Sequence, residues 1–181
     1  SSVDKLKDEV RKVVETVKDL SRRLNETAKR VADRVRKISR ETHEEVRKVV
    51  EDVKDVRRRT NDKRKLEKVL DELREVIKEA HKKNEEVLDE LRRVVKRLED
   101  EHRKALEDLE RVIRRVIKEL RREGADETVL EELKRLLDKV REDVRRSIEE
   151  IRELLKTVEK EVRDDSRDLE RLLKRVEEET K

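Results

Sequence analysis

Apolar residues recur at helical spacing along almost the whole chain, with polar and charged residues between them. The pattern repeats every eighteen residues, with three copies in each of three segments. Eighteen residues are about five whole turns of an α-helix with ~3.6 residues per turn. The apolar positions of each segment therefore stay on one side of a straight helix. The pattern predicts long helices that each bury a single stripe.

The phase of the apolar pattern breaks at two places. After the first segment the next stripe begins at Leu66, roughly half a turn out of step with the stripe before it. A reversal just before it would explain the slip, with Asn61 in a left-handed conformation after the first helix and Asp62 as the N-cap of the second. The only glycine, Gly124, marks the second break, and Asp126 can cap the third helix.

Three helices joined by short connections predict an all-α fold, an antiparallel up-down-up three-helix bundle of long, nearly straight helices. The chain, 1–181, is expected to form a single bundle with helices at about 2–60, 63–122 and 126–180. The first helix is rich in Val, Ala, Ser and Thr, whereas the other two are rich in Leu. The first helix thus has the thinner apolar seam, and the pattern leaves open whether it packs within the chain or against a partner.

A few polar residues interrupt the stripes. Folding the chain with one reversal near residue 63 and another near residue 124 brings them to two levels, about eighteen residues or ~27 Å apart. At one level His102 is expected beside Ser147 and the turn that holds Leu24 and Asn25. At the other, Asn84 is expected beside Thr42. The expected structural polar core layers contain Ser21, Asn25, His102, Ser147, Ser39, Thr42, His43, His81, Asn84 and Ser166.

These polar layers suggest a structural role in the core. A buried polar group without a partner costs about 1–3 kcal/mol, whereas a satisfied network helps to fix one alignment. An apolar seam that repeats every eighteen residues could slide by one repeat at little apolar cost. Polar layers that match in only one register would prevent the slide.

Catalytic and metal-binding chemistry is not expected at these residues. His81 and His102 would lie ~30 Å apart along one helix. Glu99 and His102 match one half of a di-iron helix motif, but no facing helix carries the second half. A core of Val and Leu offers little room for an active-site pocket, and no small-molecule ligand is expected. We expect no enzyme, no metal and no cofactor, and we keep a pH-sensing role of the histidines as an alternative to satisfied core histidines.

Composition narrows the partners. Charged residues make up 57% of the chain, and it contains no aromatic residue and no cysteine, which excludes disulfides and thiolate metal sites. The densest basic run, Arg57 to Arg59, fits a solvated helix C-terminus, so nucleic acid is not an expected partner. No apolar window is long enough to span a membrane, and the first ten residues lack the apolar core of a signal peptide. The cellular compartment stays undetermined.

The near-identical eighteen-residue units, the surface of Glu, Lys and Arg, and the isolated Ser, Thr, Asn and His layers resemble de novo designed helical bundles with buried hydrogen-bond networks. The resemblance implies a hyperstable structural scaffold and carries over no active site. A monomer is expected. The alternative is a component of a designed homo- or hetero-oligomer, or of a pH-responsive assembly, that binds a helical partner or itself. Natural spectrin-like repeats fit less well, because their cores normally contain aromatic residues.

Overall fold

The computed structural model describes residues 1–181 as three α-helices and contains no strand. Helix α1 is Ser2–Arg59, α2 is Lys63–Arg122 and α3 is Glu127–Thr180. The expected all-α class and the three long helices are confirmed. No helix is both long enough and apolar enough to cross a lipid bilayer.

The connection between α1 and α2 is held by side-chain caps. The Thr60 hydroxyl accepts the N–H of Asp62 at 3.0 Å, and the Asp62 carboxylate accepts the N–H of Arg64 at 3.0 Å. Asp62 therefore caps α2 as expected. No residue other than glycine has a positive φ, so the left-handed conformation expected at Asn61 is wrong. The Thr60 cap turns the chain without it.

The connection between α2 and α3 is a Schellman turn. Gly124 has a φ of 75°, the Ala125 N–H donates to the Leu120 carbonyl at 3.0 Å, and the Gly124 N–H donates to the Arg121 carbonyl at 3.2 Å. Glycine reaches this left-handed conformation without a Cβ clash. Asp126 lies at the N-cap position, but it accepts the Val129 N–H through its backbone carbonyl, not through its side chain.

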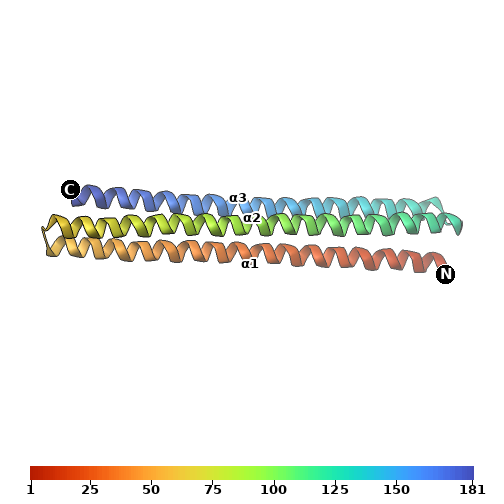
Figure 1. The fold of residues 1–181 in the computed structure, drawn as a ribbon. Coiled ribbons are helices and arrows are strands. Elements are labelled where there is room, and N and C mark those ends of the chain that lie inside the picture. Colours follow the sequence, from red (N-terminus) through yellow and green to blue (C-terminus); the bar gives the residue numbers. More distant parts are fainter. The chain divides into compact units, whose positions relative to one another are not determined.

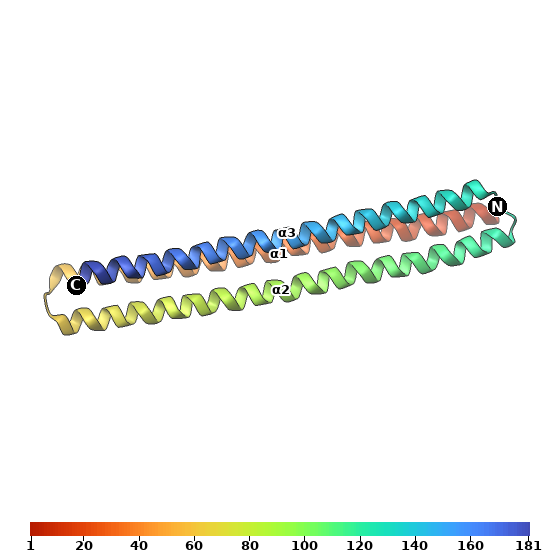
Figure 2. The same cartoon turned by 90° about the horizontal axis from the view of Figure 1, so that it is seen from above.

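The helices contribute to two compact units. Unit 1 consists of residues 1–30 and 94–154, and unit 2 consists of residues 31–93 and 155–181. Within each unit the α1 and α3 segments run in one direction and the α2 segment runs in the other (Figure 1 and Figure 2). Each unit is an antiparallel three-helix bundle. The expectation that 1–181 forms one bundle stays a prediction.

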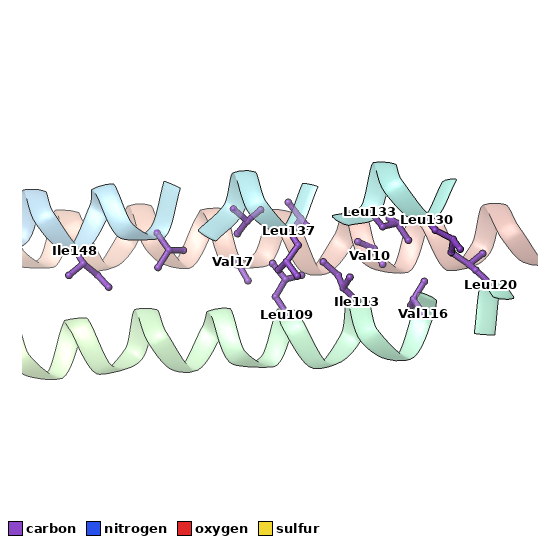
Figure 3. Packing of buried hydrophobic residues seen from close by; sticks show 13 residues of the cluster. Val10, Val17, Leu109, Ile113, Val116, Leu120, Leu130, Leu133, Leu137 and Ile148 are labelled. Atoms are coloured by element: carbon purple, nitrogen blue, oxygen red, sulfur yellow. The ribbon is translucent and has the colours of Figure 1, made fainter. Parts of the chain in front are cut away.

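Each unit has an apolar core to which all three helices contribute. In unit 1 the core contains Val10 and Val17 of α1, Leu109 and Ile113 of α2, and leucines of α3 (Figure 3). The core of unit 2 contains Val46, Val50, Val53, Leu70, Leu73, Ile77, Ala80, Leu169 and Val176. Most valines of α1 are thus buried within the chain, and no large hydrophobic residue is exposed. Most residues of the apolar stripes are buried or half-buried by packing among the three helices.

Candidate functional site

In unit 1 three polar residues, one from each helix, form a continuous chain of hydrogen bonds. We call Ser21, His102 and Ser147 the serine–histidine layer. The Ser21 Oγ lies 3.1 Å from the His102 Nε2 and 3.0 Å from the Ser147 Oγ. His102 is only 1% exposed, and its Nδ1 lies 2.8 Å from the Leu98 carbonyl oxygen. Both ring nitrogens therefore have partners, although the ring is buried in an apolar core.

Hydrogen-bonding chemistry determines the protons of this layer. The Leu98 carbonyl can only accept, so the His102 Nδ1 must carry a hydrogen. In the neutral imidazole Nε2 is then an acceptor, and the Ser21 hydroxyl donates to it. Ser21 has only one hydrogen, so with a neutral ring the Ser147 hydroxyl donates to the Ser21 oxygen, whereas with a protonated ring the Ser21 hydroxyl donates to Ser147. Each buried polar atom of the three side chains is satisfied by either order.

In unit 2 the polar residues form two separate pairs. We call Ser39, Asn84, Asp165 and Ser166 the asparagine layer. The Ser39 hydroxyl donates to Asp165 Oδ2 at 3.1 Å, and the Asn84 Nδ2 donates to the Ser166 oxygen at 3.2 Å. Both pairs end on α3, and neither joins α1 to α2. Asn84 is 2% exposed, and its Oδ1 is buried without a hydrogen-bond partner.

The levels of the layers on α1 differ from the expected ones by about one turn. His102 contacts Ser21, not the turn of Leu24 and Asn25. The expected register placed the reversal near residue 63, whereas α1 ends at Arg59 and α2 begins at Lys63, which centres it near residue 61. In an antiparallel pair, a shift of the reversal moves the facing position by twice as much. This doubling accounts for the difference.

Four of the expected core residues do not join a layer. Asn25 donates through Nδ2 to Glu150 at 3.3 Å, and its Oδ1 is buried without a partner. Thr42 is buried, and its hydroxyl donates to the Ile38 carbonyl of its own helix at 2.8 Å. The other two residues outside the layers are half-buried histidines. The Nε2 of His81 lies 2.5 Å from Glu170 Oε1, and His43 borders a hollow lined by Asp168 and Arg171.

Sequence reasoning missed the carboxylates that partner these residues. Asp165, Glu150 and Glu170 lie beside the apolar stripe of α3, where acidic residues read as solvated surface. Asp165 was detectable in principle, because it stands one repeat after Ser147. A residue at the layer position of a repeat is a candidate partner even when it is charged.

Ion pairs between helices border the layers. In unit 1 Arg152 binds both carboxylate oxygens of Glu99, at 2.7 and 3.3 Å, and in unit 2 Arg36 binds both oxygens of Glu161, at 2.7 and 3.2 Å. Hydrogen bonding to these carboxylates raises the pKa of Arg152 and of Arg36 above the ordinary value. The pairs are partly exposed, so each contributes little to stability but adds directional contacts at the edges.

The geometry of the serine–histidine layer fits a structural role better than a catalytic one. A serine bonded to a histidine is the beginning of a nucleophilic site. The His102 ring, however, is 1% exposed, and its second nitrogen is held by a backbone carbonyl and not by a carboxylate. A substrate could not reach it without opening the unit. No group of three or more His, Asp or Glu side chains is placed to hold a metal ion.

Comparison with known proteins gives a likeness of architecture. No protein-family model and no curated protein sequence matches the chain. Among solved structures the chain is similar to a "Computationally designed three helix bundle", at 18% sequence identity and a TM-score of 0.35, with 99% of this chain and 86% of that chain covered. At this identity and score the assignment of the fold rests on the helices described above. The chain is all-helical, and each of its two units is a three-helix bundle.

Proposed function

We propose that this protein is a designed structural scaffold, monomeric and without catalytic activity, in which polar core layers select the alignment of the helices. The observation that carries the proposal is the serine–histidine layer, whose hydrogen bonds run from α2 through Ser21 of α1 to α3 with no buried polar atom left over. A fully satisfied polar network inside a core favours one arrangement over others that the apolar residues alone would tolerate.

The loops and the layers restrict different movements. A slide by one full repeat would move a helix end ~27 Å, and connections of three or four residues cannot span that distance. Slips of one turn, ~5.4 Å, need only unwind a helix end. Such a slip would bring Leu98 or Leu106 to the level of Ser21 and leave the hydroxyls of the layer in an apolar surrounding. Each orphaned polar group would cost about 1–3 kcal/mol.

A variant of unit 1 without its layer tests this role. Ser21→Ala, His102→Leu and Ser147→Ala together replace all three polar side chains by apolar ones, and such a replacement is near neutral or stabilising for the fold. Spin labels at the exposed Glu26→Cys and Glu101→Cys report the α1–α2 alignment, because the chain has no other cysteine. We expect one narrow distance distribution in the parent and several distances or self-association in the variant.

A matched control changes one buried apolar residue on each helix and keeps the layer intact. Val17→Ile, Leu109→Ile and Ile148→Leu alter the same core. The control should keep the single distance of the parent and a monomeric mass by light scattering. If the variant without the layer also keeps one narrow distribution and a monomeric mass, the layer does not select the register.

The alternative of a pH-responsive assembly has weaker support from the geometry. If His102 is protonated, its Nε2–H donates to the Ser21 oxygen, and the Ser21 hydroxyl turns to donate to Ser147. The hydrogen-bond chain reverses and keeps its contacts in either protonation state. Circular dichroism and light scattering from about pH 7 to about pH 4 test this alternative, and a change of mass would favour it.

A further inference from the structure

A continuous groove lies between α1 and α2 in unit 2. Two adjoining hollows of about 640 and 600 Å³ form it, and they share Glu75 and Val76. The groove follows residues 42–53 of α1 and residues 68–86 of α2. We call it the α1–α2 groove.

The floor of the groove is apolar and made of small side chains. Its apolar lining consists of Val46, Val49, Val53, Val69, Val76 and Ala80. Val46, Val53 and Ala80 are buried, whereas the other three valines are only half-buried. Short side chains on both helices do not fill the space above the seam, so apolar surface remains in contact with solvent along it.

No polar contact bridges the groove. In unit 2 every hydrogen bond or ion pair between helices has one partner on α3, as in Arg36–Glu161 and Arg92–Glu159. None joins α1 to α2. Unit 1 differs, because Glu9 of α1 pairs with Arg115 of α2 and the serine–histidine layer joins the same two helices. The α1–α2 seam is therefore closed by polar contacts in unit 1 and left open in unit 2.

The rim of the groove is acidic. Seven carboxylates and three lysines line it, a net of −4, although the whole chain has a net charge of +4. Asp71 is paired with Arg74. The other six carboxylates form no ion pair within the chain: Glu45, Asp52, Glu72, Glu75, Glu79 and Glu86. An apolar floor between unpaired carboxylates matches a helix with one apolar stripe flanked by Lys or Arg.

We propose that the α1–α2 groove binds a basic amphipathic helix from another protein, which adds a fourth helix to unit 2. Residues 68–86 of α2 span ~28 Å at ~1.5 Å per residue, which fits about three heptads of a partner helix. A second copy of the folded chain fits less well, because it exposes no large hydrophobic residue that could enter the groove. The proposal goes beyond the scaffold role and does not depend on the polar layers.

A synthetic peptide provides the probe. It has about 21 residues, Leu and Ile on one stripe, Lys and Arg beside the stripe and a single Trp within it. The protein has no aromatic residue, so tryptophan emission reports only the peptide. We expect saturable binding with a blue shift, at one peptide per chain, and weaker binding at higher salt. A peptide with the same apolar stripe but Glu in place of Lys and Arg should not bind.

Charge-reversal variants locate the site. Glu75 and Glu79 are exposed and unpaired, so Glu75→Lys with Glu79→Lys should leave the fold intact and weaken binding about tenfold. Glu101→Lys with Glu107→Lys makes the same charge change on α2 outside the groove and should leave binding unchanged. Val76→Arg should also weaken binding, because its long side chain would obstruct the apolar floor and adds a further positive charge there.

Three results would overturn the proposal. The first is the absence of saturable binding by the basic peptide. The second is equal weakening by the groove and control variants, which would mean general attraction to an acidic surface. The third is a dimeric mass of the chain alone that becomes monomeric in Val76→Arg, which would assign the groove to a second copy.

Discussion

The serine–histidine layer and the asparagine layer occupy equivalent positions of the repeat, yet their hydrogen bonding differs. Ser21 and Ser39, His102 and Asn84, and Ser147 and Asp165 are each one repeat of eighteen residues apart. In unit 1 the imidazole reaches α1 and all polar atoms of the layer are satisfied. In unit 2 the shorter amide makes one hydrogen bond, to α3, and leaves its oxygen unpaired. The comparison shows that the reach of the α2 side chain distinguishes one network across three helices from two separate pairs.

The largest expected difference follows from truncating the central residue of each layer. His102→Ala removes a buried ring and leaves Ser21 without its bond to α2, so we expect the free energy of unfolding to fall by about 3 kcal/mol. Asn84→Ala removes a smaller group that is already incompletely bonded and should cost about 1 kcal/mol. Guanidinium unfolding of both variants measures the difference, and equal losses would contradict the contrast between the layers.

Converting the asparagine layer into a serine–histidine layer tests the same contrast in the opposite direction. Asn84→His with Asp165→Ser gives unit 2 the residue types of unit 1. The new Nδ1 would meet the Ala80 carbonyl, four residues earlier, as the Nδ1 of His102 meets that of Leu98. We expect the free energy of unfolding to rise by about 2 kcal/mol.

Asn84→Leu is the control for this gain. It removes the unsatisfied oxygen without adding a bridge to α1, so it should raise the stability by less than about 1 kcal/mol. In the variant with Asn84→His, nitrogen NMR of the new imidazole identifies which ring nitrogen carries the hydrogen, and we expect it on Nδ1 as in His102. An equal gain from the leucine variant would mean that the bridge adds nothing.

Removal of the two equivalent serine hydroxyls should give a smaller difference. Ser21→Ala leaves the buried Nε2 of His102 without a donor and should cost about 1–2 kcal/mol. Ser39→Ala removes the hydroxyl that donates to Asp165. Because Asp165 is half-buried and can bind water instead, we expect the free energy of unfolding to fall by only about 0.5 kcal/mol. Thermal and guanidinium unfolding compare the two, and a larger loss for Ser39→Ala would reverse the ranking of the layers.

The smallest expected effect concerns an exposed ion pair on the surface of unit 1. Such surface pairs should contribute equally little to the stability of both units. A hydrogen bond from Arg145, with the charges of Arg145 and Arg146, holds the pKa of Glu142 below its ordinary value of 4.5. Because the folded pKa is the lower one, the pairing stabilises the fold above about pH 4.5, and this contribution is lost as the pH falls through the folded pKa.

Carbon NMR of the Glu142 carboxyl measures this pKa directly. We expect Arg145→Ala to raise it towards 4.5 and to leave the contacts of the serine–histidine layer unchanged. An unchanged pKa in the variant would show that the arginine does not hold the carboxylate. The matched variant Arg145→Lys should give an intermediate pKa, since lysine keeps the charge but loses the forked geometry.

Much of the fold was predictable from periodicity and a few turn residues. The eighteen-residue stripe predicted the helices, Gly124 marked the second connection, and Asp62 marked the start of α2. The left-handed conformation predicted for Asn61 was wrong, because the Thr60 hydroxyl accepts the N–H of Asp62 and the connection forms without a left-handed residue. The level of His102 on α1 was missed by about one turn, because an error of about two residues in the reversal is doubled in an antiparallel pair.

The candidate site was less predictable than the fold. Polar interruptions of a stripe can be read from the sequence, and they included the three members of the serine–histidine layer. Their partners could not be read in the same way. Thr42 bonds to its own backbone, and Asn25 bonds to a carboxylate at the edge, since local geometry decides between such choices over distances of about 1 Å or less.

The sequence by itself determined the helices, their buried faces and the residue types that enter the core, because these depend on spacing along one chain. The tertiary structure decided which polar residues meet, which buried oxygens remain unpaired and where the α1–α2 seam stays open. These features depend on the level of one helix against another and on the reach of single side chains. A shift of one turn, ~5.4 Å, is enough to exchange one hydrogen-bond partner for another.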